Sequence, residues 1–139
     1  MGGRVGGPSE TGLSQVYLDT HAAVFLQAGE IELLGNEGKR QIELCDLLIS
    51  PMVFLEFEYL YASKAIRYGA RQMFADLNTS FGVTLCTLPF PAVAHEALSI
   101  DWTRDPFDRM IVAQAQLNHG AALITRDRLI RRNYVRSIW

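Results

Sequence analysis

The sequence predicts an α/β fold of three layers, α/β/α, with a short central parallel sheet. Three observations favour this fold class. Short apolar runs alternate with longer stretches of helical character along most of the chain, which is the pattern of parallel strands joined by helices. Ser50-Pro51 and Asp105-Pro106 each combine a helix-capping residue with a proline suited to the first helical turn. Glycines follow several of the predicted helices and supply the usual helix stop.

The first half of the chain contains two predicted strands. Residues 1–14 are rich in Gly, Ser and Pro, so we expect a flexible leader followed by a single domain over 15–139. Thr20 is placed to cap the first helix, and Gly29 to end it. The elements predicted here are a strand at 15–19, a helix at 20–27, a broken helix or two short helices within 30–44, a strand at 47–50 and a helix at 52–66.

The second half supplies three more strands and the most clearly marked helix. The stretch FDRMIVAQAQLNH follows Asp105-Pro106 and ends before Gly120, so both of its ends carry a signal. The elements predicted here are a helix at 70–81 closed by Gly82, a strand at 83–89, helices at 91–100 and 107–119, a strand at 121–125, a helix at 126–133 and a strand at 134–139.

The composition excludes several classes of protein. Of the 139 residues, 49% are hydrophobic and 20% are charged, which favours one globular domain over a disordered chain. Cys45 and Cys86 lie far apart and form no C-x-x-C motif, so neither a zinc knuckle nor a redox motif is supported. No apolar run is long enough to cross a membrane, and the Gly-rich start is unlike a secretory signal. We therefore expect a cytoplasmic protein that does not associate with membranes.

Positive charge is concentrated toward the end of the sequence. Residues 104–139 contain seven of the 13 basic side chains, all of them arginine, and three acids, so this segment is net +4 although the whole chain is −2. Arginine binds phosphate through two parallel hydrogen bonds. A solvated basic helix accounts for the charge equally well, so the pattern indicates a nucleic-acid partner only in combination with other features.

Four acids stand at or near the carboxyl ends of predicted strands, where ligands bind in parallel α/β sheets. Asp19 ends the first strand, and Asp127 follows the fourth. Asp108 lies in the first turn of the helix before that strand, with its Cβ directed toward the same sheet edge. Glu56 lies in the second turn of the helix after the second strand. We expect these carboxylates to converge on one cleft.

Such a cluster needs a counter-charge, because several like charges within a few Å cannot all stay ionised. A divalent cation supplies it. Oxygen ligands without His or Cys favour Mg²⁺ or Mn²⁺, and Mg²⁺ held by a few carboxylates is suited to phosphate substrates. The cation also stabilises the charge that builds on phosphorus oxygens. The predicted reaction is therefore hydrolysis of a phosphodiester.

Each aspartate also has a purely structural interpretation. Asp19 and Asp127 are suited to cap the helices that follow them, and Asp105 is a more natural cap than a ligand because it precedes proline. An acid at Asp108 is favourable at any helix N-terminus, since it opposes the helix dipole. Local sequence alone does not separate these roles from catalysis.

Periodicity leaves two further points open. It does not choose between Glu56 and Glu58, because the helix around both is apolar on nearly every side. A general-base role for a histidine close to Asp19 is conceivable, but a lone histidine at a helix start is more often structural. The three histidines, none of which has metal-ligand spacing, are His21, His95 and His119.

Taken together, the motifs resemble those of PIN-domain ribonucleases, in particular the VapC toxins of bacterial and archaeal toxin–antitoxin pairs. YLDTHAAVF matches the family's first acid at Asp19, and ISPMVFLEF matches the spacing that selects Glu56 over Glu58. RDPFDRMIVAQA followed by LITRD is the most specific part, with Asp108 and Asp127 as the third and fourth acids. The resemblance covers nearly the whole chain after the leader.

The resemblance implies a three-layer PIN fold and a Mg²⁺- or Mn²⁺-dependent endoribonuclease. It assigns metal binding to Asp19, Asp108 and Asp127. Glu56 would orient the attacking water or act as a further ligand. The residues that would hold the ligands in place are Thr20, Thr125 and Asp105. The candidates to bind RNA phosphate are Arg109, Arg126 and Arg128.

Three partners follow from the same resemblance: an RNA substrate, a cognate antitoxin protein and a second copy of the chain in a homodimer. The antitoxin is expected to bind exposed apolar surface, on the aromatic-rich helix around Glu56. The sequence departs from the family in its longer leader. It also departs in its acidic charge before residue 104, which leaves only a narrow basic area for RNA.

Competing α/β families fit less well. A haloacid-dehalogenase-type phosphatase needs a second Asp where His21 stands, and a receiver domain needs a late lysine, although the last one here is Lys64. No P-loop motif occurs. The remaining alternative is a noncatalytic PIN-fold module that binds RNA or protein. Loss of one acid would mark such a module, and the presence of all four favours the enzyme.

Overall fold

A computed structural model of the protein describes residues 14–139. Apart from Ser14, the expected leader lies outside the described residues. Within the described range, no helix is long and apolar enough to cross a membrane.

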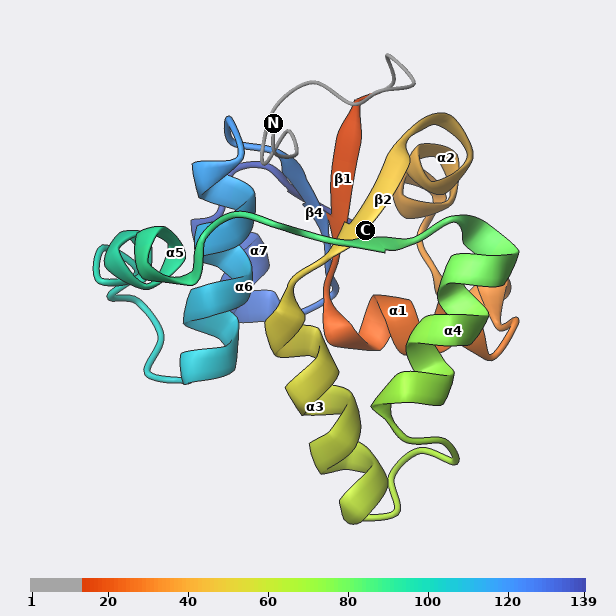
Figure 1. The fold of residues 1–139 in the computed structure, drawn as a ribbon. Coiled ribbons are helices and arrows are strands. Elements are labelled where there is room, and N and C mark those ends of the chain that lie inside the picture. The colour runs from red at the N-terminus through yellow and green to blue at the C-terminus, as the bar shows by residue number, and fades with distance from the viewer. Residues whose placement is uncertain (1–13) are drawn as a thin grey trace.

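Five parallel strands form the sheet of the described chain, in the order β3-β2-β1-β4-β5 (Figure 1). These strands are β1 (Gln15–Leu18), β2 (Asp46–Ile49), β3 (Thr84–Leu85), β4 (Ala122–Ile124) and β5 (Ser137–Ile138). The central strand β1 pairs with β2 on one side and with β4 on the other, so that Val16 lies opposite both Leu47 and Ala122. The point at which the strand order reverses direction, between β1 and β4, therefore lies in the middle of the sheet.

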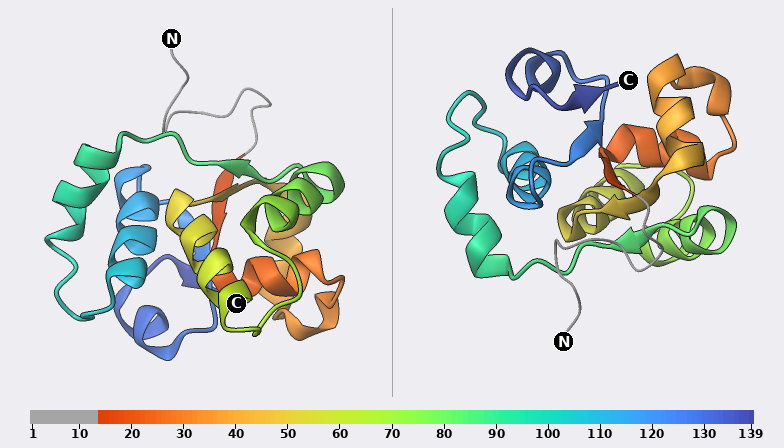
Figure 2. Two further views of the ribbon diagram at one scale, coloured as in Figure 1. Left: turned by 60° about the horizontal axis from the view of Figure 1, so that its bottom comes forward. Right: turned by 90° about the horizontal axis from the view of Figure 1, so that it is seen from above.

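Helices cover both faces of the sheet and complete three layers. They are α1 (Thr20–Gln27), the 3₁₀ helix η1 (Ile31–Leu33), α2 (Asn36–Leu44), α3 (Pro51–Ala62), α4 (Ala70–Phe81), α5 (Phe90–Ala97), α6 (Pro106–Leu117) and α7 (Arg128–Asn133). Helices α5, α6 and α7 lie on one side of the strands, and α1, α2 and α4 lie on the other (Figure 1 and Figure 2). Helix α3 contacts both α4 and α6. This arrangement confirms the predicted three-layer fold.

The centre of the core is formed by the two middle strands. Val16, Tyr17 and Leu18 of β1, and Leu123 and Ile124 of β4, are almost completely buried. Such continuous burial is typical of parallel strands that are covered on both faces. These strands therefore give firm support to the polar residues that follow their carboxyl ends.

A buried polar network fixes α6 against the sheet. Asn118, at the C-terminal end of α6, donates from its side chain to the Tyr17 hydroxyl over 3.0 Å and to Gln15 Oε1 over 3.1 Å. The Tyr17 oxygen also lies 2.9 Å from Cys86 Sγ. Burial raises the pKa of the Tyr17 phenol, so the hydroxyl keeps its proton at neutral pH. The network sets the axial position of α6, and with it the position of the first turn of that helix.

The helix predicted over 20–27 has the expected bounds but a different capping residue, and the helices predicted over 52–66, 91–100 and 126–133 differ at their ends. Helix α1 is capped by Asp19 rather than by Thr20, because the Asp19 carboxylate accepts the Thr20 backbone N–H. The helix that the sequence extends to residue 66 ends at Ala62, and Lys64 just beyond it has a left-handed φ of 65°. These differences concern helix ends, where local hydrogen bonds decide the boundary.

Two predicted strands are also shorter than expected. The sequence predicts strands over 83–89 and 134–139, but only Thr84–Leu85 and Ser137–Ile138 pair with a neighbour. Both are edge strands, with a partner on one side only. Short edges are a common way for proteins to limit unwanted strand pairing.

Candidate functional site

The connections that leave β1 and β4 diverge at the carboxyl end of the sheet. From β1 the chain moves outward through β2 to β3 and then crosses back to β4, on the other side of β1. Such a switch point opens a crevice where ligands bind in parallel α/β proteins. Asp19 follows β1, and residues 125–127 follow β4. Polar groups thus stand on both sides of the crevice.

Asp19 is buried, with 8% of its surface exposed. One carboxylate oxygen accepts the Thr20 backbone N–H over 2.8 Å, and the other accepts the Thr125 hydroxyl over 2.6 Å. Burial raises the pKa of the Asp19 carboxyl, and these two hydrogen bonds oppose the shift. The residue is therefore both the cap of α1 and a firmly oriented carboxylate.

Glu56 extends from the second turn of α3 toward the same place. The Thr20 hydroxyl donates to Glu56 Oε1, so the residue after Asp19 links the two acids. Burial is the main cause that raises the pKa of Glu56, and the charge of Asp19 adds to it. Glu58 instead accepts the Ala70 backbone N–H over 3.0 Å, at the start of α4. Of the two glutamates that periodicity could not separate, Glu56 lies beside Asp19.

Asp105 and Asp108 contribute from the first turn of α6. Asp105 caps the helix, and its Oδ1 accepts the backbone N–H of Phe107 over 2.8 Å and that of Asp108 over 3.3 Å. No hydrogen bond to the Asp108 carboxylate occurs within residues 14–139. Burial raises the pKa of Asp108 to about 7, reinforced by the charges of Asp105, Asp19, Asp127 and Glu56. Asp108 is therefore an acid on which four other acids of the site act.

Asp127 caps α7 on the opposite side of the crevice. Its Oδ1 accepts the Ile130 backbone N–H over 3.0 Å, while its own N–H donates to Thr125 Oγ1 over 3.1 Å. Because the Thr125 hydroxyl donates to Asp19, this threonine connects the two acids through a single oxygen. The structural role that the sequence allows for Asp127 is thus real and coexists with its place at the crevice.

These side chains surround one open pocket of about 350 Å³. Its lining is Asp19, His21, Glu56, Asp105, Asp108, Arg126 and Asp127. All four predicted acids are brought together, as is Asp105. His21, which sequence reasoning treated as structural, also lines the pocket. Its place two residues after Asp19, in the first turn of α1, is the signal that could have identified it.

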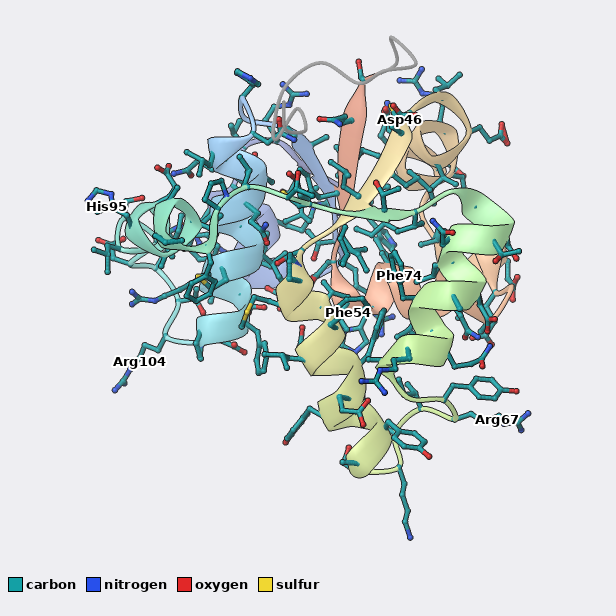
Figure 3. The ribbon with its side chains drawn as sticks, viewed as in Figure 1. Asp46, Phe54, Arg67, Phe74, His95 and Arg104 are labelled. Carbon is teal, nitrogen blue, oxygen red and sulfur yellow. The ribbon has the colours of Figure 1, made fainter. Side chains whose placement is uncertain are left out.

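The three predicted phosphate-binding arginines are placed differently. Arg126 lines the pocket. The Arg109 Nε donates to the Thr103 carbonyl over 2.8 Å and so ties α6 to the preceding loop. Arg128 is exposed at the start of α7 and does not line the pocket. Arg104 and His95 extend outward from the surface (Figure 3).

The donor set fits a hard divalent cation. Carboxylate oxygens from four separate segments line the pocket, and no cysteine does. The negative charges of these acids repel one another, and a cation would neutralise them. In the part of the chain that the structure describes, no three such groups already have the spacing of a closed metal site. Mg²⁺ usually keeps several waters and takes only one or two protein carboxylates directly. An open pocket of this size accommodates that mode of binding.

Solved structures with a similar fold include two toxin–antitoxin assemblies. A toxin–antitoxin complex from Klebsiella pneumoniae is 19% identical, with a TM-score of 0.62, over 89% of this chain and 96% of that one. DNA-bound VapBC from Salmonella typhimurium is 17% identical, with a TM-score of 0.59, over 91% of this chain and 98% of that one. At these identities the likeness is one of fold. A comparison with curated proteins gives no match.

The sequence also matches a family model directly. The model of the PIN domain covers residues 16–135, which includes β2, β3 and β4, all of β1 except Gln15, and all of the acids around the pocket. Since this match spans most of the chain and agrees with the observed fold, the protein belongs to the PIN domain family.

Proposed function

We propose that the protein is a Mg²⁺- or Mn²⁺-dependent endoribonuclease and the toxin of a toxin–antitoxin pair. The observation that carries this proposal is the pocket at the β1–β4 switch point, which gathers five carboxylates from four segments. Placing acids close together disfavours their ionisation, and neither a structural core nor a solvated surface needs such a cluster. A site that binds a divalent cation for phosphate chemistry does need one.

Asp19, Asp108 and Asp127 are the residues that would hold the ion. When bound, the ion supplies electrostatic stabilisation of the charge that develops on the scissile phosphate. Glu56 is held by the Thr20 hydroxyl and orients the attacking water. Thr125 fixes the Asp19 carboxylate, so the ligand geometry is set before substrate arrives.

Positive charge near the pocket would bind the RNA backbone. Arg126 lies in the pocket wall and is the first candidate to contact a phosphate. Arg128 follows on the exposed start of α7, and Arg109 still has two free guanidinium nitrogens beyond the Nε that binds Thr103. These contacts would position RNA without reading its sequence.

An antitoxin would bind the apolar groove between α3 and α4. Its open volume is about 690 Å³, and it is lined by Phe54, Leu55, Glu58, Tyr61, Gly69, Ala70, Arg71 and Gln72. Phe54, which lines the groove, meets Phe74 of α4 edge to face, with ring centroids 5.2 Å apart (Figure 3). Leu55, Tyr59 and Tyr61 remain exposed on α3. An amphipathic helix of the antitoxin suits such a groove.

The proposal includes a homodimer and a cytoplasmic location. Phe90 and Leu98 on and just after α5 are strongly exposed, which gives a second copy an apolar surface separate from the α3–α4 groove. Sedimentation velocity on the purified chain tests the dimer directly. A concentration-independent monomer would remove it from the proposal.

Cleavage of a mixed RNA pool tests the activity. The wild type and Asp19→Asn are compared, free of any partner, with Mg²⁺, with Mn²⁺ and with EDTA. Cutting that requires the metal and is lost in the variant supports the enzyme. A folded wild type that binds metal and RNA but cuts nothing would favour the alternative, a noncatalytic module that binds RNA or protein.

A further inference from the structure

One arginine lies in the wall of the carboxylate pocket and pairs with none of its acids. Arg126 lines the pocket together with five carboxylates. Guanidinium and carboxylate groups form short, often bidentate hydrogen bonds wherever they can meet. Among the described residues, however, the ion pair that forms is between Arg40 and Glu37 on α2. The guanidinium of Arg126 makes a different contact instead.

That contact is with Phe25. The central carbon of the Arg126 guanidinium lies 4.8 Å from the centroid of the Phe25 ring, which is a cation–π contact. Phe25 belongs to α1, the helix that Asp19 caps, so the same element positions its ring and the Asp19 carboxylate. The guanidinium of Arg126 therefore lies over an aromatic ring at the edge of the pocket.

The Phe25 ring is itself fixed by a second aromatic residue. Trp139 meets it edge to face, with centroids 6.2 Å apart and an interplanar angle of 66°. The backbone of Trp139 rests on Gly35 at the start of α2, where a Cβ atom would lie 2.4 Å from the Trp139 carbonyl carbon. This close approach holds Trp139 in place, and Trp139 restricts the rotation of Phe25.

We propose that Phe25, braced by Trp139, is a positioning residue that holds the Arg126 guanidinium off the pocket acids. This leaves the carboxylates free for a divalent cation and the guanidinium free for an RNA phosphate. Without the aromatic face, Arg126 would pair with the acids and compete with the cation for them. The inference rests on the proposed metal-dependent function.

Isothermal titration of the metal-free full chain with Mn²⁺ alone tests this. Phe25→Leu is expected to weaken Mn²⁺ binding by about three- to tenfold, the range expected from one cation–π contact. The double variant Phe25→Leu/Arg126→Gln is expected to bind Mn²⁺ as well as Arg126→Gln alone, because the competing cation is gone. The matched control is Phe74→Leu, which also removes one member of an aromatic pair but lies at the α3–α4 groove.

The outcomes separate the inference from the proposed function. A wild type that does not bind Mn²⁺ contradicts both. A wild type that binds Mn²⁺ while Phe25→Leu binds equally tightly contradicts only the inference. A double variant that binds Mn²⁺ as weakly as Phe25→Leu also contradicts only the inference, because the loss of affinity would then come from altered packing. Thermal unfolding checks each variant, and Trp139→Leu, expected to give a smaller loss, replaces Phe25→Leu if the latter does not fold.

Discussion

Two threonines determine how the acids of the pocket are oriented. Thr20 uses its backbone N–H on Asp19 and its hydroxyl on Glu56. The Thr125 hydroxyl donates to Asp19 and accepts from the Asp127 backbone. Asp108 has no comparable partner in the described chain, and burial raises its pKa, reinforced by the charges of four neighbouring acids. The residues differ accordingly in what their replacement should do.

Asp127→Asn separates the structural role of this residue from its proposed role in metal binding. Asparagine caps helices as well as aspartate, so the thermal midpoint should stay within a few degrees of the wild-type value. The metal-dependent rate of RNA cleavage should fall by more than about 100-fold, the upper end of losses seen for residues that merely support a metal ligand. Full activity in this variant would remove Asp127 from the site.

Asp108→Asn is expected to stabilise the metal-free protein. The neutral amide removes one charge from the cluster, worth about 1 kcal/mol once solvent screening of this half-buried group is allowed for. That corresponds to a rise of about 3–5 °C in Tm. Differential scanning calorimetry in EDTA at pH 8 measures it, and an unchanged Tm would contradict the electrostatic account of this residue.

The same variant makes a prediction about pH. Because the folded-state pKa of Asp108 is raised to about 7 from an ordinary value of 3.8, the folded state binds more protons than the unfolded state between these values. Through Asp108 the wild type therefore loses stability as pH rises through that window, and Asp108→Asn lacks this part of the loss. The Tm difference should be small near pH 4 and complete by pH 8.

Glu56→Gln and Glu58→Gln form a matched pair on one helix. Glu56→Gln should lower the cleavage rate by about 10- to 100-fold, because it keeps the shape but loses the charge beside Asp19. Glu58→Gln should leave the rate unchanged, since Glu58 binds the α4 backbone instead. Rates measured at saturating Mn²⁺ decide this, and the reverse order would move the site to Glu58.

At the scale of whole elements, helix starts are predictable from the sequence and strand lengths are not. Ser50-Pro51 and Asp105-Pro106 begin α3 and α6 as predicted, because the capping side chain and the proline act locally. Gly82, with a φ of 68°, ends α4 where expected. How many residues of β3 and β5 pair depends on neighbours that the local sequence does not contain.

The candidate site was likewise predictable from the sequence only in part. The acids could be chosen from strand ends and from the family resemblance, and they do surround one pocket. The separate roles of Arg109 and Arg126 could not be predicted, because both are arginines close to an acid in the sequence. Tertiary contacts distinguish them: Thr103 holds the first, and Phe25 holds the second.

The α3–α4 groove gives a prediction at this scale. Leu55→Arg should weaken binding of the proposed antitoxin by at least about tenfold. RNA cleavage by the free chain should be unaffected. Leu44→Arg is the matched control, because Leu44 is 53% exposed on α2 and Leu55 is 57% exposed on α3. Equal binding of both variants, measured by titration calorimetry, would place the antitoxin elsewhere.

For the molecule as a whole, the proposed metal site would couple metal binding to folding. Its acids come from α1, α3, α6 and the start of α7, so the unfolded chain has no equivalent site. Mn²⁺ at 100 times its dissociation constant should stabilise the fold by about 2.7 kcal/mol, or roughly 8–12 °C in Tm. EDTA should reverse the rise, and Asp19→Asn should abolish it. An unchanged wild-type midpoint in saturating Mn²⁺ would contradict the site.

The strand order also controls when the pocket can exist during synthesis. Asp19 and the threonine that orients it are 106 residues apart, and β4, which brings that threonine to β1, is the fourth strand to be made. At typical rates of about 5–20 residues per second, the ribosome needs roughly 5–20 s between the two halves of the site. A nascent chain that has not reached β4 therefore has no assembled pocket, and any activity of this site can begin only after β4 has been made.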